Sequence, residues 1–278
     1  MENTIVEMLI PHNDPNGLRI IKLAGWIGRA FVIPRADIKE IKALKEASHP
    51  AVYFLIGEED GKATVYIGQT DNFERRLNQQ VVAKNYWDIA MVFTGELDID
   101  VQYLEYICTK EARESGRYEI KNATGTPGRN ISDFQRVANN KFFENIKFVV
   151  SLLSYPIFQE VPKEQQADKI YHLKLSRSND VLGRGALLSS GEFVVYAGSM
   201  ARIVEAKSFQ GRKGSGLRKQ LIDEGVLQNQ DGISYIFTKD YIFGSPSAAG
   251  YVITGMSTNG WTSWKDKNGK TLDENVRK

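Results

Sequence analysis

The alternation of apolar and polar residues near the N-terminus predicts β-strands joined by tight turns. Residues 18–23 and 28–34 alternate in this way on either side of a short turn, and they predict a first hairpin. A second hairpin is predicted by residues 52–56 and 64–67, which flank an acidic turn centred on Asp60-Gly61. The first part of the chain is therefore expected to contain an antiparallel sheet.

Apolar residues at helical spacing follow these hairpins. Val101, Leu104, Cys108 and Ala112 share one face of a helix for which Asp100 is the expected N-cap. Strands are expected at residues 89–94 and 148–153, and helices at residues 38–47, from Phe73 onwards after the cap Asn72, at 100–115 and at 132–146.

Two prolines mark the best candidate for a domain boundary, because Pro156 and Pro162 are followed by a polar stretch. Beyond them we expect strands at 170–175 and 192–197, a helix at 216–225 and a hairpin with Asp231-Gly232 at its turn. The pattern predicts an α+β protein in three parts: an N-terminal β-hairpin and helix extension (1–48), a sandwich of a small antiparallel sheet flanked by helices (49–155) and a separate α+β domain (165–278).

The composition is that of an ordinary globular protein. The 278 residues are 42% hydrophobic, and 36 Lys+Arg stand against 34 Asp+Glu, a net charge of +2. The single cysteine, Cys108, excludes a disulfide framework and a multi-cysteine zinc site. The N-terminus does not read as a signal peptide, and no run approaches the roughly 18 apolar residues of a membrane helix. We therefore expect a cytoplasmic protein without a membrane contact.

Two tyrosines of the second hairpin and a nearby arginine form the first candidate for a functional site. The expected turn pairs Tyr53 with Gly68. It also pairs Leu55 with Tyr66, so the two phenols lie on one face of the sheet. Arg76 comes one turn into the following helix and is aimed back at this face. A guanidinium binds phosphate through two N–H groups and a phenol can orient or deprotonate water, so the three fit a phosphate-handling surface. Packing tyrosines beside a solvated arginine are the alternative.

Five elements follow one another in order here: Ala51-Val-Tyr53, Tyr66-Ile-Gly68, Asn72-x-x-x-Arg76-Leu77, Leu104-Glu105 and Asn122. This ordered set, in a strand–turn–strand–helix context, resembles the signature of the GIY-YIG nuclease superfamily. The resemblance extends over about residues 49–125. In it Glu105 is similar to the family's metal-binding glutamate, and Asn122 to its late asparagine.

The resemblance implies a metal-dependent DNA endonuclease whose site contains Tyr53, Tyr66, Arg76, Glu105 and Asn122. Glu105 would hold one Mg²⁺, with Mn²⁺ as a substitute, and the ion would polarise the scissile phosphate. Arg76 would stabilise charge on the phosphoryl oxygens, and Asn122 would position the backbone or a phosphate. One of the two tyrosines would orient or deprotonate the attacking water, and the sequence leaves open which one. No small-molecule cofactor is implied.

Three positions depart from the family pattern. Ala51 replaces the first motif glycine, Gln69 stands where repair-type members often have lysine, and Gln80 stands where many members have a tyrosine or histidine. Two hypotheses follow. The first is an active endonuclease of restriction, phage defence or a mobile element. The second is a catalytically decayed nucleic-acid-binding or adaptor protein of a restriction complex.

The C-terminal half contains a basic segment. Residues 201–220 hold six cations against one acid, a local net charge of +5. The segment from Phe209 to Gly216 precedes a predicted helix, so backbone N–H groups and cations can meet phosphates there, although a solvated loop explains the pattern equally well. The predicted nucleic-acid contacts are Gly68 of the hairpin and Arg212, Lys213, Arg218 and Lys219.

Residues 217–225, 243–249 and 259–264 resemble a C-terminal domain of unknown function found behind GIY-YIG domains and in restriction-associated proteins. By analogy this domain is expected to recognise DNA or to dock a partner, with Trp261 and Trp264 in its core. DNA is the expected partner. Because one active site cuts one strand, a double-strand cut needs either a second copy of the chain or two sequential nicks. A component of a restriction complex is the other candidate partner.

Overall fold

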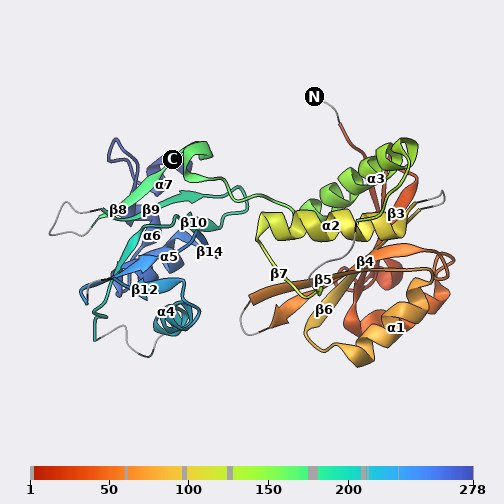
Figure 1. The fold of residues 1–278 in the computed structure, drawn as a ribbon, viewed down its shortest axis with the longest axis horizontal. Helices are drawn as coiled ribbons and strands as arrows, with labels where there is room; N and C mark the ends of the chain where they lie inside the picture. The colour runs from red at the N-terminus through yellow and green to blue at the C-terminus, as the bar shows by residue number, and fades with distance from the viewer. Residues whose placement is uncertain are drawn as a thin grey trace. The chain divides into compact units, whose positions relative to one another are not determined.

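The chain forms two compact units, Met1–Val161 and Pro162–Lys278, in the computed structural model (Figure 1). Both units combine helices with largely antiparallel sheets, so the predicted α+β class is confirmed. No helix among the described residues is long and apolar enough to cross a membrane. The structure describes residues 3–59, 62–95, 99–123, 128–174, 181–207, 211, 213–230 and 232–277.

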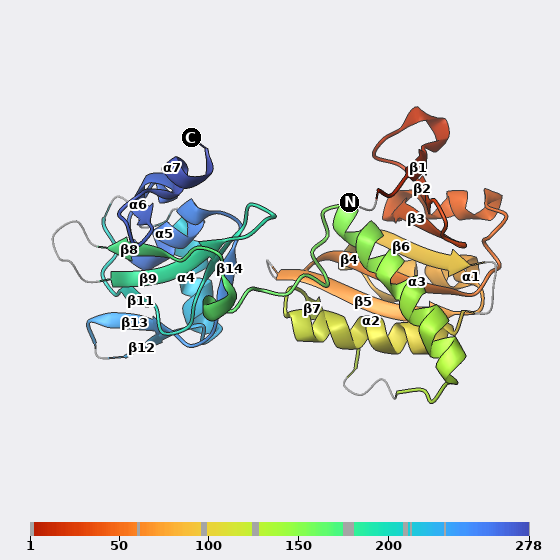
Figure 2. The same cartoon turned by 90° about the horizontal axis from the view of Figure 1, so that it is seen from above.

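Seven strands form the sheet of the first unit, in the order β1-β2-β3-β6-β4-β5-β7 (Figure 2). Neighbouring strands are antiparallel except β5 and β7, which run parallel. Residues 1–48, expected as an extension of their own, contribute three strands to this sheet, because β3 pairs with β6 along its whole length. The strands are β1 Val6–Leu9, β2 Arg19–Leu23, β3 Gly28–Pro34, β4 Ala51–Glu59, β5 Lys62–Thr70, β6 Trp87–Gly95 and β7 Glu119–Ile120.

The β4–β5 hairpin has the predicted register. Tyr53 lies opposite Gly68, and Leu55 lies opposite Tyr66. The predicted turn residues Asp60 and Gly61 lie outside the described residues. Side chains alternate between the faces of a strand, so this register places both phenols on the same face of the sheet.

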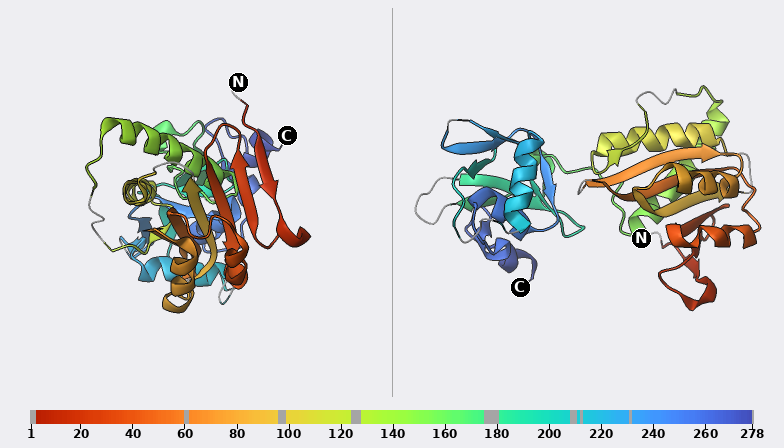
Figure 3. Two further views of the ribbon diagram at one scale, coloured as in Figure 1. Left: turned by 90° about the vertical axis from the view of Figure 1, so that its right-hand side faces the viewer. Right: turned by 90° about the horizontal axis from the view of Figure 1, so that it is seen from below.

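Helices cover both faces of this sheet (Figure 3). Helices α2 and α3 pack on the face that carries Val52 and Phe54, whereas α1 and the 3-10 helix η2 pack on the face that carries Tyr53 and Leu55. The expected cap Asp100 accepts a hydrogen bond from the Tyr103 N–H, which confirms the start of α2. The helical segments are η1 Pro11–Asn13, η2 Arg35–Ala43, α1 Phe73–Ala83, α2 Val101–Ser115 and α3 Asp133–Leu152.

Two predicted elements of this unit differ from the structure. Residues 148–153, predicted as a strand, belong to α3, in which Val149 and Val150 are buried together with Ile146. Tertiary packing on the sheet here outweighs the β-propensity of the valines. Residues 38–47, predicted as a short helix, differ from the structure in their bounds, because the helix is a 3-10 helix over Arg35–Ala43. Ile38 and Ile41 are both buried. They are three residues apart, so they lie on the same side of a helix that has three residues per turn.

The second unit contains a five-stranded sheet, β14-β10-β9-β8-β15, and a three-stranded sheet, β11-β13-β12. Trp264 is fully buried, donates from Nε1 to the Pro246 carbonyl at 3.0 Å and packs 4.5 Å from the Phe193 ring, which confirms it as core. Strand β9 was not predicted, and the predicted turn residue Asp231 lies outside the described residues. The elements are η3 Glu164–Gln166, β8 Tyr171–Lys174, β9 Val181–Leu187, β10 Phe193–Val195, β11 Met200–Arg202, α4 Lys213–Asp223, β12 Leu227–Asn229, β13 Ser234–Phe237, β14 Tyr241–Phe243, α5 Pro246–Thr254, α6 Gly260–Ser263, β15 Trp264–Lys265 and α7 Leu272–Val276.

Candidate active site

The two phenols of the β4–β5 hairpin lie next to each other. The ring centroids of Tyr53 and Tyr66 are 6.1 Å apart, with an angle of 41° between the ring planes. Tyr53 is fully buried, while Tyr66 is only partly buried. Of the two, Tyr66 therefore has the phenol that solvent or a substrate can reach.

Gly68 permits this arrangement. A Cβ at this position would lie 2.6 Å from both Cζ and Oη of Tyr53 and 2.9 Å from a ring carbon of Tyr66. Real Cβ atoms do not approach other atoms this closely, so any side chain here would displace the phenols. Gly68 was predicted to contact nucleic acid; the structure shows that its missing side chain makes room for the Tyr53 ring.

Arg76 reaches the phenols from the first turns of α1. The helix is capped by Asn72, whose side chain accepts from the Arg75 N–H at 2.9 Å. Arg76 then donates from Nε to the Tyr53 hydroxyl at 2.9 Å. Gln80, one turn further along the same face, donates its amide to the same hydroxyl at 3.2 Å. The expected approach of Arg76 to the hairpin is thus observed.

Burial keeps the Tyr53 phenol in its protonated form. Burial raises the pKa of the Tyr53 phenol well above its ordinary value, and the neighbouring Tyr66 raises it further. The hydrogen bond from Arg76 lowers that pKa only in part, so Tyr53 keeps its proton at neutral pH. The same hydrogen bond raises the pKa of Arg76, which keeps its charge. Tyr53 is therefore suited to hold the guanidinium and is a poor proton acceptor.

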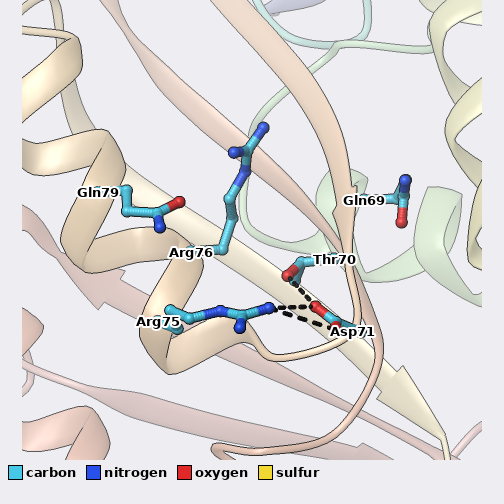
Figure 4. Close-up of a pocket in the computed structure, with 6 residues that line it drawn as sticks. All are labelled: Gln69, Thr70, Asp71, Arg75, Arg76 and Gln79. Carbon is cyan, nitrogen blue, oxygen red and sulfur yellow. Dashed lines mark hydrogen bonds and ion pairs between the residues drawn. The ribbon is translucent and has the colours of Figure 1, made fainter.

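A polar pocket of about 420 Å³ opens beside Arg76, where β5 ends and α1 begins. Figure 4 shows Arg75 turned towards Asp71, with which it forms an ion pair of 2.9 Å, while the Arg76 side chain points away from that pair. Among the described residues no carboxylate lies within ion-pair distance of Arg76. Its charge is therefore available to an anion. The lining residues are Gln69, Thr70, Asp71, Arg75, Arg76 and Gln79.

The side-chain amide of Asn122 forms hydrogen bonds with the backbone of β5 at its outer edge. Its Oδ1 accepts from the Ile67 N–H at 2.9 Å, and its Nδ2 donates to the Ile67 carbonyl at 2.5 Å. These two bonds continue the edge pairing where β7 ends, since β7 pairs only with Thr64 and Val65. Because Ile67 directly follows Tyr66, the Asn122 amide holds the strand that carries this phenol. Backbone positioning, one of the two roles implied for Asn122, fits this geometry.

Glu105 lies on α2, which covers the sheet face opposite the phenols. Its carboxylate is half-buried, and burial raises its pKa, while the charge of Arg76 lowers it. The carboxylate has no hydrogen-bond or ion-pair partner among the described residues. No hydrogen bond or ion pair joins Glu105 to Arg76 or to the two tyrosines.

The donor set around Glu105 is sparse. The described residues contain no group of three or more His, Cys, Asp or Glu side chains that could hold a metal ion. A caged structural metal therefore does not fit. Mg²⁺ typically binds one or two carboxylates and completes its shell with water and substrate phosphates, so a single unpartnered carboxylate does fit this ion.

The predicted phosphate contacts of the second unit have different environments. Arg218 is only 1% exposed, pairs with Glu205 at 3.7 Å and donates to the Val252 carbonyl at 2.8 Å. The prediction that Arg218 contacts nucleic acid is therefore wrong, because this side chain makes its contacts inside the domain. Lys219 is exposed on α4 and stays a prediction. Arg212 and the side chain of Lys213 lie outside the described residues.

Sequence reasoning missed two contributors to the site. Gln80 was noted only for lacking an aromatic ring, whereas its amide donates to the Tyr53 hydroxyl. Its position four residues after Arg76 is the signal that could have shown this, because residues four apart share a helix face. Lys84 places its ammonium 4.3 Å from the centroid of the Tyr66 ring, and no local motif indicates this contact.

The comparisons with known proteins concern the second unit. Residues 173–276 match DUF4357, a domain of unknown function, which supports the expected C-terminal domain. This match does not include residues 49–125, and no GIY-YIG family match is found, so the resemblance of that region to these nucleases stays a prediction. No curated protein and no solved structure matches the chain.

Proposed function

We propose that the first unit is a metal-dependent DNA endonuclease that hydrolyses phosphodiester bonds at the edge of β5, in a setting of restriction, phage defence or a mobile element. One observation supports this most. The Arg76 guanidinium is held by a neutral phenol beside a polar pocket, with no carboxylate to cancel its charge. An uncompensated guanidinium is a favourable partner for a phosphodiester.

Each residue has a role that follows from its surroundings. Arg76 would bind the phosphoryl oxygens and stabilise the charge that builds on them during hydrolysis. Tyr53 and Gln80 fix the orientation of Arg76 through the Tyr53 hydroxyl. Tyr66, the more accessible phenol, would orient the attacking water or take its proton. Asn122 keeps Tyr66 in place by holding the strand at Ile67.

Glu105 would hold the metal ion. An unpaired, half-buried carboxylate lowers the stability of the folded protein. A bound cation would offset this cost. Bound Mg²⁺ would polarise the phosphate and stabilise the leaving oxygen. Mn²⁺, which takes similar oxygen ligands, is the expected substitute.

The test is a nicking assay on supercoiled plasmid DNA with the full-length chain. We expect relaxed and linear DNA to form with Mg²⁺ and not with EDTA, and Glu105→Gln to leave only a trace of this activity. Glu111→Gln removes the same charge from the same helix and should leave cutting intact. Undiminished cutting by Glu105→Gln would refute the assignment of the metal ligand.

A second candidate is a nucleic-acid-binding protein whose nuclease site has decayed. The departures from the family pattern at Ala51, Gln69 and Gln80 favour it. This protein would bind DNA with an affinity that falls steeply with salt, and it would cut no substrate with any divalent ion. A screen of duplex, single-stranded and modified DNA distinguishes the two candidates.

A further inference from the structure

Lys84 is held between two aromatic rings at the end of α1. Its Nζ lies 4.3 Å from the centroid of the Tyr66 ring and 6.0 Å from that of Tyr86. The Tyr86 hydroxyl is buried and has no hydrogen-bond partner among the described residues. An ammonium over the face of an aromatic ring keeps its full charge, because the ring offers a quadrupole and no counter-charge.

Two other cations of the unit are already neutralised by carboxylates. Arg75 pairs with Asp71, and Lys121 pairs with both Glu59 and Glu119. Lys84 has no ion pair with any described residue. It therefore contributes an uncompensated positive charge, as Arg76 does.

Arg76 and Lys84 both lie near the pair of tyrosines. Arg76 donates to the Tyr53 hydroxyl, and the Tyr53 ring centroid lies 6.1 Å from that of Tyr66. Lys84 lies over the face of the Tyr66 ring. Two free cations thus lie near the accessible phenol, and a polyanion that reaches Tyr66 comes close to both.

We infer that Lys84 is a second phosphate contact of this site and binds the nucleic-acid backbone next to the phosphodiester held by Arg76. This inference rests on the proposed function in that it assumes a nucleic-acid substrate. It does not require cleavage. Lys84 would also keep the Tyr66 ring in its orientation, so it is both a binding and a positioning residue.

The test measures binding without catalysis, with the full-length chain and a short fluorescent DNA duplex in EDTA. Lys84→Gln should weaken binding by about 5- to 30-fold and reduce the slope of log Kd against log salt by about one. Lys84→Arg should retain most of the affinity. Lys141→Gln removes an exposed charge from α3 and should change little. Lys84→Met, which keeps the apolar stem, is a second variant in case the glutamine alters folding.

Cleavage kinetics provide an independent readout. In the nicking assay Lys84→Gln should raise KM much more than it lowers kcat, as expected for a contact made before the transition state. An unchanged affinity and salt slope in Lys84→Gln would overturn this inference and leave the nuclease proposal intact. Lys84-dependent binding without any cleavage would support the contact and overturn the nuclease proposal. An absence of DNA binding by the unmodified chain would overturn both.

Discussion

Arg76 in the first unit and Arg218 in the second were both predicted to bind phosphate, yet their environments differ. Each lies in the early turns of a helix, α1 or α4. Arg76 borders a polar pocket and bonds to a neutral phenol, whereas Arg218 is buried and pairs with Glu205. A count of cations therefore does not locate an anion site. A guanidinium is available to an anion only where its protein partners leave its charge uncancelled.

Of these two arginines, Arg76 should show the larger effect, through the loss of catalysis in Arg76→Ala. We expect kcat for plasmid nicking to fall by about 10²- to 10³-fold, the usual loss when one charge-stabilising donor is removed. Arg76→Lys should also be poor, because lysine has no Nε–H to donate to Tyr53 while binding phosphate. Nicking rates in Mg²⁺ measure both variants. Wild-type rates in Arg76→Ala would contradict the proposed role.

Arg218→Met tests whether the buried arginine stabilises the second unit. Without its partner the Glu205 carboxylate remains in a largely buried position and the Val252 carbonyl loses a donor. We expect the free energy of unfolding of the second unit to fall by about 2–4 kcal/mol. Denaturant unfolding measures this, with the exposed Lys219→Met on the same helix as the control. A variant of normal stability that binds DNA more weakly would restore Arg218 as a phosphate contact.

Gly68→Ala tests the packing beneath the phenols. The new Cβ would meet Tyr53 at 2.6 Å, so the ring must move and the bond from Arg76 must loosen. We expect a stability loss of about 1–3 kcal/mol and a lower kcat. Gly116→Ala, at a position with free space for a Cβ but a positive φ, is the control for backbone effects alone. Equal activity in Gly68→Ala and the wild type would show that the phenol arrangement is dispensable.

The smallest predicted effect is a gain in stability from Glu105→Gln. Because burial raises the pKa of this carboxyl in the folded state, its ionised form destabilises the fold at neutral pH. The variant should therefore melt about 1–3 °C higher in EDTA. The gain should shrink as the pH falls through the raised pKa, where the wild-type carboxyl also becomes neutral. A lower Tm for the variant would mean that the carboxylate has a stabilising partner.

The local arrangement of the site could be predicted from the sequence because it depends on short-range rules. Period-two alternation and the turn position set the register that pairs Tyr53 with Gly68. The cap at Asn72 sets where α1 begins and hence where Arg76 points. The extension of α3 through Val149 could not be predicted in this way, since its valines favour strands until the sheet provides a packing surface.

Contacts between distant segments were the other limit. Arg218 is buried because β13 supplies Tyr235 and α5 supplies the Val252 carbonyl, and neither is visible in the local charge pattern. Lys84 meets Tyr66 only because α1 ends beside β5. Glu105 is a further example. Its helix α2 was predicted correctly, but the packing of α2 on the sheet face opposite the phenols was not.

A double-mutant cycle in Mg²⁺-dependent cleavage tests most directly whether Arg76 and Glu105 act at one site. If both act on one phosphodiester, Arg76→Ala combined with Glu105→Gln should be no slower than the slower single variant, because groups that act as a unit are not additive. Losses that simply multiply, or a wild-type chain that cuts no DNA, would contradict a shared site.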